Sequence, residues 1–177
     1  MQTDSYLNDA IEQFQKIKTL ADKAIVQISK DDFFAVLDEE SNSVAIIIKH
    51  LAGNMRSRWT DFLATDGEKP DRNRDSEFII GTQETRESVL EQWEVGWRLL
   101  FEAITPLSPL DLGRTVYIRN EPHSVLRAIN RQLTHYAYHV GQIVFLGKHF
   151  AAGRWRSLSV PRGRSEEFNV EMREKRS

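Results

Sequence analysis

Two histidines, His135 and His139, lie four residues apart in a stretch whose apolar spacing predicts a helix. Side chains at positions i and i+4 of a helix lie on one face, with their Cβ atoms about 5–6 Å apart. Two imidazoles in this arrangement can bind one transition-metal ion. The alternative is that both are amphipathic residues at the edge of the core, and the pair alone does not decide between the two.

Polar residues on the same predicted helix favour the metal site. Gln132 and Gln142 share the face of the two histidines, and polar side chains inside a helical protein must find partners. A third histidine, His50, lies midway along another predicted helix, at the flank of its apolar face, with Asn54 one turn later. Three imidazoles from facing helices would leave an open coordination position, which is typical of catalytic metal sites.

Two amides are candidates for holding the metal ligands. Asn54 lies one turn from His50, and Gln142 is three residues beyond His139. Either amide could orient a ligand or a bound water. Alternatively, both satisfy the backbone or each other.

The elements that position these residues are predicted to be long amphipathic helices. Apolar residues recur at spacings of three and four over four stretches, and Ser43 and Ser124 are candidate N-caps. We expect helices over about residues 4–29, 43–64, 83–105 and 124–149. The β-branched and aromatic residues 115–118 predict a short strand that turns back at Asn120.

These elements predict an all-α protein, a four-helix bundle with a short β-hairpin before the last helix and an extended C-terminal tail. Residues 1–177 form one domain, with the bundle over about 4–149 and a tail without helical period over about 150–177. The connection at 65–82 is long and polar, so a simple up-down topology is not required, and loops of this length are often functional.

Composition excludes several classes of protein. The 177 residues carry a net charge of −2, which argues against a nucleic-acid partner. Cysteine is absent, which excludes disulfides, thiolate metal sites and a cysteine nucleophile. The longest aliphatic run, Val44–Ile48, is far too short to span a membrane, and the first residues do not resemble a signal peptide. We therefore expect a cytoplasmic protein with no membrane partner.

The residues between the paired histidines argue against two metalloenzyme classes. They are Tyr136, Ala137 and Tyr138, so the glutamate base of HExxH proteases is missing. The Glu-x-x-His pairs of carboxylate-bridged di-iron proteins are missing as well. No general acid or base stands out, and the catalytic residues remain unknown at this level.

The segments around the histidines resemble the DinB/YfiT-like superfamily of four-helix-bundle proteins. Residues 50–54 (HLAGN) and 135–143 (HYAYHVGQI) carry the resemblance, the second as the pattern H-x-x-x-H-x-G-Q-[IL]. Residues 54–62, 66–69 and 158–165 resemble one uncharacterised bacterial subfamily, a domain of unknown function. The resemblance covers nearly the whole chain.

This resemblance implies a divalent metal, zinc or nickel, held by His50, His135 and His139. Characterised members include thiol transferases that use bacillithiol and a mycothiol-dependent maleylpyruvate isomerase, others are known as stress- or damage-induced proteins, and many are homodimers. We therefore expect a metal-dependent enzyme that transfers a low-molecular-weight thiol, similar to bacillithiol or glutathione, to a small electrophilic substrate. The alternatives are a non-catalytic metal-binding protein of the stress or damage response, and a bundle whose imidazoles only form hydrogen bonds.

Arginines supply candidate contacts for such ligands. Arg56 and Arg58 lie two residues apart on the His50 helix, so they point in different directions and one can be a solvated charge. Arg162 and Arg164 flank a glycine in the tail and could bind the carboxylate of a thiol cofactor. The alternative for the tail pair is a solvated basic loop.

Overall fold

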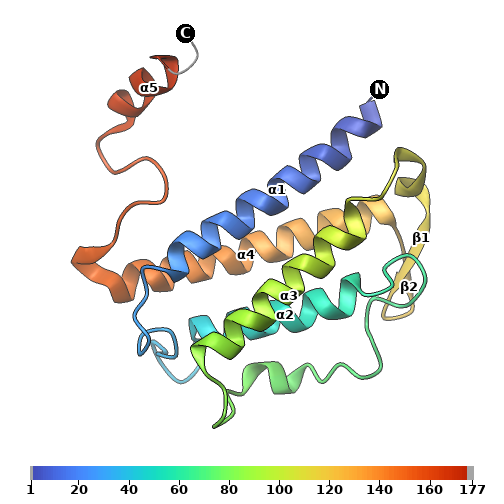
Figure 1. Ribbon diagram of the computed structural model, residues 1–177, viewed down its shortest axis with the longest axis horizontal. Coiled ribbons are helices and arrows are strands. Elements are labelled where there is room, and N and C mark those ends of the chain that lie inside the picture. The colour runs from blue at the N-terminus through green and yellow to red at the C-terminus, as the bar shows by residue number, and fades with distance from the viewer. Residues whose placement is uncertain (1, 175–177) are drawn as a thin grey trace.

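The computed structural model describes residues 2–174 and is mostly helical (Figure 1). Its four long helices are α1 (Gln2–Ile25), α2 (Val44–Trp59), α3 (Arg86–Ile104) and α4 (Val125–Ala151). The smaller elements are the helix α5 (Ser165–Glu174), the 3-10 turns η1 (Asp75–Phe78), η2 (Pro109–Gly113) and η3 (Ala152–Arg154), and the strands β1 (Thr115–Ile118) and β2 (Glu121–Ser124). The four predicted long helices and the hairpin before α4 are thereby confirmed.

Side-chain caps set where the helices begin. The hydroxyl oxygens of Ser43 and Ser124 accept backbone N–H groups in the first turns of α2 and α4, as predicted. Helix α3 begins later than residue 83, after a capping box in which Thr85 and Ser88 bond each other's backbone N–H. Local side-chain chemistry therefore explains all three starts.

Helix α2 ends at Trp59 and not near residue 64. Thr60 is extended and Asp61 has a φ of 50°, so the helical hydrogen-bond pattern cannot continue. Helix α1 is also shorter than predicted and ends at Ile25. The apolar spacing continues beyond both ends, which is why the sequence pattern overestimated these helices.

The prediction of an extended tail is wrong over α5, because residues 165–174 are helical. No residue of α5 is buried, and Figure 1 shows it set apart from the four long helices. Without a packed apolar face, this helix has no strong period that the sequence could reveal. The last three residues of the predicted tail lie outside the described residues.

The core forms where the four long helices converge. Helix α2 packs along α3 and α1 along α4, while α2 and α4 also touch each other. Phe14, Trp59, Trp97 and Tyr136 are buried and meet edge-on or tilted, with ring centroids 5.8–6.4 Å apart where they touch. Each such side chain contributes about 1.5–3 kcal/mol by leaving water.

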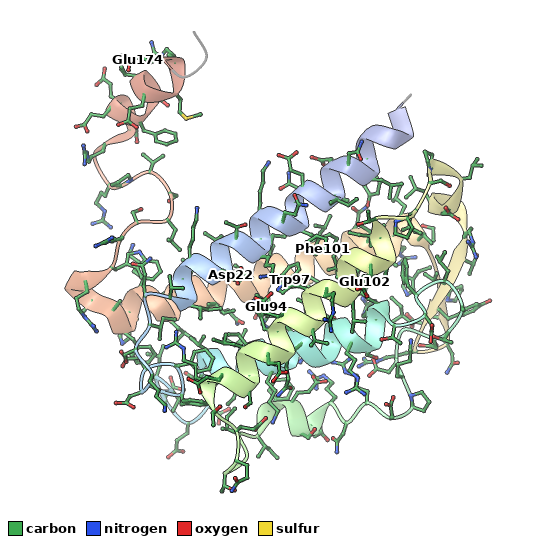
Figure 2. The ribbon with its side chains drawn as sticks, in the orientation of Figure 1. Asp22, Glu94, Trp97, Phe101, Glu102 and Glu174 are labelled. Carbon is green, nitrogen blue, oxygen red and sulfur yellow. The ribbon has the colours of Figure 1, made fainter. Side chains whose placement is uncertain are left out.

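Close approach of α2 and α3 depends on Gly96. A Cβ there would lie 3.1 Å from the Met55 sulfur and 3.4 Å from the Ala52 backbone. On the outer side, Lys18 of α1 bonds Asp22 on the same helix and Glu94 of α3, at 2.8 and 2.9 Å (Figure 2 labels both carboxylates). Close packing therefore holds α2 against α3, and an ion pair on the outer side connects α1 with α3.

The hairpin turns through Arg119 and Asn120, with φ angles of 57° and 62°. Both residues of a two-residue type I′ turn need positive φ, which asparagine tolerates well. Asp66 stabilises this turn, because its carboxylate accepts both backbone N–H groups at 2.9 and 2.7 Å. The hairpin is therefore tied to the connection between α2 and α3.

None of the helices within residues 2–174 combines the length and the apolar character that crossing a membrane requires.

Candidate metal centre

Three histidines come together between α2 and α4. His50 lies on α2, and His135 and His139 lie one turn apart on α4. One ligand atom from each lies within 4.8 Å of the other two, and the ring centroids are 4.8–5.5 Å apart. We call these residues the three-histidine group. Their imidazoles are close enough to share one metal ion after small side-chain movements.

The three histidines are buried or half-buried between the helices. His50 is 5% exposed, and the other two are half-buried. Burial, followed by the two neighbouring imidazoles, lowers the pKa of His135 to about 3. Burial also lowers the pKa of His139, against the opposing effect of its hydrogen bond to Gln142. Both rings are neutral at pH 7, which is the state that binds a metal.

Two oxygen atoms each engage one ring nitrogen of the group. The Nδ1–H of His50 donates to Glu77 Oε2 at 2.9 Å, and the Nδ1–H of His139 donates to Gln142 Oε1 at 2.7 Å. In a neutral imidazole held in this way, Nε2 is the nitrogen with a free lone pair. Metal-binding histidines are held in this way by a carboxylate or carbonyl on the far nitrogen.

Glu77 is the carboxylate that the sequence analysis did not find. It lies on η1 in the long connection after α2, and its side chain is 7% exposed. Arg72 holds it through two bonds, Nε to Oε1 at 2.8 Å and Nη2 to Oε2 at 3.0 Å. Burial by itself would raise the pKa of Glu77, but the hydrogen bond from His50 and the contact with Arg72 lower it. Glu77 is therefore ionised at pH 7.

Gly53 on α2 leaves room for this carboxylate. A Cβ at Gly53 would overlap the side chain of Glu77, which His50 and Arg72 hold in place. The small residue between His50 and Asn54 in the HLAGN motif thus has a steric reason. The glycine at position 53 was the available sequence signal that a side chain from another segment packs against α2.

The connection that carries Glu77 is anchored along its length, and we call residues 65–81 the site loop. Glu68 accepts two hydrogen bonds from the Arg58 guanidinium at 3.0 Å and two from Arg72 at 3.3 Å. Arg58 also donates to the carbonyl oxygen of Gly67, and that glycine's N–H donates to Tyr117 on β1 at 2.7 Å. The site loop is fixed to both α2 and the hairpin.

The side chain of Asn54 hydrogen-bonds to Tyr136 of α4. Its side-chain oxygen accepts from the Tyr136 hydroxyl at 3.1 Å, and that hydroxyl accepts from Trp59 Nε1 at 3.0 Å. All three residues are buried. This series of hydrogen bonds connects α2 to α4 one turn from His50 and keeps the two helices in register.

The structure does not bring the other predicted arginines to the centre. Arg56 is exposed on α2, with its guanidinium 4.0 Å from Asp71. Arg162 and Arg164 are exposed in the segment before α5, where Arg164 pairs with Glu167. Of the pair on α2, Arg58 is the buried one, at 5% exposure.

A pocket of about 430 Å³ opens onto the three-histidine group. His50 and His135 line it, together with Asn54 and Gln132. Small-molecule sites typically have volumes of about 300–1,000 Å³. The centre is therefore accessible to a ligand as well as to an ion.

Comparison with protein-family models gives a match over most of the chain. A family model described as "Protein of unknown function (DUF1572)" matches residues 2–164 of the chain. No curated protein matches it. The matched range ends just before α5 and contains the four long helices, the site loop and the hairpin.

Proposed function

The chain belongs to the DUF1572 family of proteins of unknown function, and we propose that it is a divalent-metal-dependent enzyme. The observation that carries this proposal is the three-histidine group, with a ligand atom of each residue within 4.8 Å of the others. The pocket beside it favours a catalytic role over a structural one, because structural sites are closed by a fourth protein ligand.

The donor set fits zinc or nickel. Imidazole nitrogens suit both ions, and both accept three protein ligands with positions left for water or substrate. Glu77 and Gln142 hold the Nδ1 atoms of two of the rings, which leaves Nε2 as the nitrogen available to an ion. When bound, such an ion lowers the pKa of a water or thiol ligand and so supplies a nucleophile near neutral pH.

The reaction class we propose is the transfer of a low-molecular-weight thiol to an electrophilic substrate. This proposal rests on the resemblance to DinB-like proteins. On the same ground we propose that the fold is their four-helix bundle. The pairing of α2 with α3 and of α1 with α4 is compatible with such a bundle. Because the chain has no cysteine, the thiol must enter as a second small molecule. Homodimerisation remains a prediction.

Metal analysis of tag-free protein by plasma mass spectrometry tests the centre. We expect about one zinc or nickel ion per chain in the wild type and none in His135→Ala. His149→Ala is the matched control, because His149 is an exposed histidine on the same helix. Absence of stoichiometric metal, even after zinc or nickel is added, would refute the proposal.

Catalysis requires a separate assay. Metal-loaded protein is incubated with bacillithiol or glutathione and a panel of electrophiles, and loss of free thiol is followed against the His135→Ala variant. Turnover that depends on the metal supports the enzyme. Full metal occupancy with no turnover across the panel would favour the non-catalytic metal-binding alternative.

A further inference from the structure

The pocket beside the three-histidine group is lined by an unusual number of cations. Five arginines contribute to its wall: Arg58, Arg72, Arg74, Arg119 and Arg131. Within the part of the chain that the structure describes, no aspartate or glutamate lines this pocket. Guanidinium groups gathered in one concave site repel each other unless anions are present.

Three of these arginines form ion pairs with carboxylates that do not line the pocket. Arg58, Arg72 and Arg119 all contact Glu68, and Arg72 also contacts Glu77. The side chains of Arg58 and Arg72 are only 5% exposed. These two hold the site loop, so their hydrogen-bonding capacity is largely used.

The other two arginines are differently placed. Among residues 2–174, neither Arg74 nor Arg131 pairs with a carboxylate, and both are exposed to solvent at the pocket. The Arg74 guanidinium lies 5.1 Å from the ring centre of Phe78, a cation–π distance. The Phe78 ring in turn lies 5.0 Å from that of His50. Arg74 is thus held next to the centre without losing its charge.

Arg131 precedes His135 by four residues on α4, so the two side chains lie on the same face of that helix. A ligand in the pocket can therefore reach the guanidinium of Arg131 and the three-histidine group together. Arginine binds carboxylate and phosphate groups with two parallel hydrogen bonds, which also fixes their orientation.

We propose that this pocket binds a small-molecule oxyanion, the carboxylate or phosphate group of a ligand, through Arg74 and Arg131 beside the three-histidine group. The inference rests on the proposed function in one respect: the second group that the ligand contacts is the metal ion held by the three-histidine group. The proposal restricts the class of ligand: either the substrate or the thiol carries an acidic group close to its reacting atom. The pocket volume of about 430 Å³ and the net charge of −2 favour a small anion over a nucleic acid.

Binding of two probes, inorganic phosphate and succinate, tests this assignment. Each is titrated by ligand-detected NMR into metal-free and zinc-loaded protein at constant ionic strength. We expect at least one probe to bind, and the double variant Arg74→Gln/Arg131→Gln to weaken it by about tenfold or more. The matched control is Arg98→Gln, since Arg98 is exposed on α3 outside the pocket. Circular dichroism verifies that each variant is folded.

Each outcome bears on the proposal. Binding of neither probe, or an equal loss in Arg98→Gln, would overturn it, as would tight binding of a short RNA oligonucleotide without binding of small anions. The arm without metal keeps the two proposals separable. If zinc does not bind but the probes bind in an Arg74- and Arg131-dependent manner, the metal enzyme fails and the anion site stands.

Discussion

The site loop (residues 65–81) and the segment after α4 (residues 155–174, here the C-terminal segment) contain similar residues, yet they behave differently. Both hold a glycine, a proline and several charges of each sign. In the site loop, the side chains of Arg72 and Glu77 are 5% and 7% exposed. In the C-terminal segment, those of Arg164 and Glu167 are 63% and 60% exposed.

The difference lies in the partners that each segment meets. Two carboxylates of the site loop reach buried groups on α2: Glu68 pairs with Arg58, and Glu77 pairs with His50. In the C-terminal segment, by contrast, Arg164 pairs with Glu167 three residues later, and both side chains stay exposed. A charge contributes to a site when the fold removes it from water beside an opposite charge, whereas exposed pairs contribute about 1 kcal/mol or less.

Arg72→Gln compared with Arg164→Gln gives the largest expected contrast. Arg72 is buried between two carboxylates, so its loss leaves both Glu68 and Glu77 short of a partner. We expect the free energy of unfolding to fall by about 3–5 kcal/mol in Arg72→Gln and to stay close to that of the wild type in Arg164→Gln. Urea denaturation measures both. Equal effects would mean that the site loop is no more integrated than the C-terminal segment.

Acid pH should weaken the site loop through Glu68. Burial by itself would raise the pKa of Glu68, but Arg72, Arg58 and Arg119 lower it below the ordinary value of 4.5. A lowered folded pKa contributes stability that is fully present above the unfolded value and is lost as the pH falls through the folded value. At pH 7, Glu68→Gln should lower the free energy of unfolding by about 1.5–3 kcal/mol.

The measurement for Glu68 is the difference between wild type and Glu68→Gln, followed by urea denaturation from pH 7 downward. That difference should shrink below the ordinary pKa of 4.5. Glu166→Gln, in the exposed α5, is the control and should show no such trend. A difference that stays constant with pH would contradict the assignment of Glu68 as an ionised partner.

Glu77→Gln should weaken metal binding without removing it. The glutamine can still accept the His50 hydrogen bond, but it lacks the charge that makes the imidazole a stronger donor to the ion. We expect zinc affinity to fall by about tenfold, measured by competition with a chelator at pH 7. Glu167→Gln is the control in the C-terminal segment. Unchanged affinity in folded Glu77→Gln would show that the carboxylate only anchors the loop.

Removal of residues 165–177 should have the smallest effect. The helix α5 within this range buries no residue, and the family match ends at residue 164. We expect the free energy of unfolding to change by about 0.5 kcal/mol or less, with zinc binding unaltered. Thermal unfolding and metal analysis test this. A large loss of either would assign the C-terminal segment a role that its exposure does not indicate.

The sequence by itself determined the four long helices and the hairpin, because their signals are local. Apolar residues at spacings of three and four define the helices, and Ser43 and Ser124 cap them through hydrogen bonds within one turn. The positive φ at Asn120 is likewise a property of that residue type. The short helix α5 escaped prediction because it has no packed face to leave a pattern.

The candidate centre was predictable only in part. The i, i+4 spacing of His135 and His139 places them together on any helix. The position of His50 on a second predicted helix made it the candidate third ligand, and the resemblance implied the same set of three. Spacing gives no such signal for Glu77, which lies 27 positions from His50, and Gly53 indicates only that some group packs against α2. In the sequence, nothing distinguishes the Glu77 carboxylate from the exposed carboxylates of the C-terminal segment.

Only the tertiary structure decided which charges belong to the site. It folds the connection after α2 back along that helix, so Arg72 and Glu77 become buried beside His50, and it leaves Arg162 and Arg164 in solvent. The physical reason is that helix formation depends on neighbours within one or two turns, whereas removal of a charge from water requires a partner brought close by the whole fold.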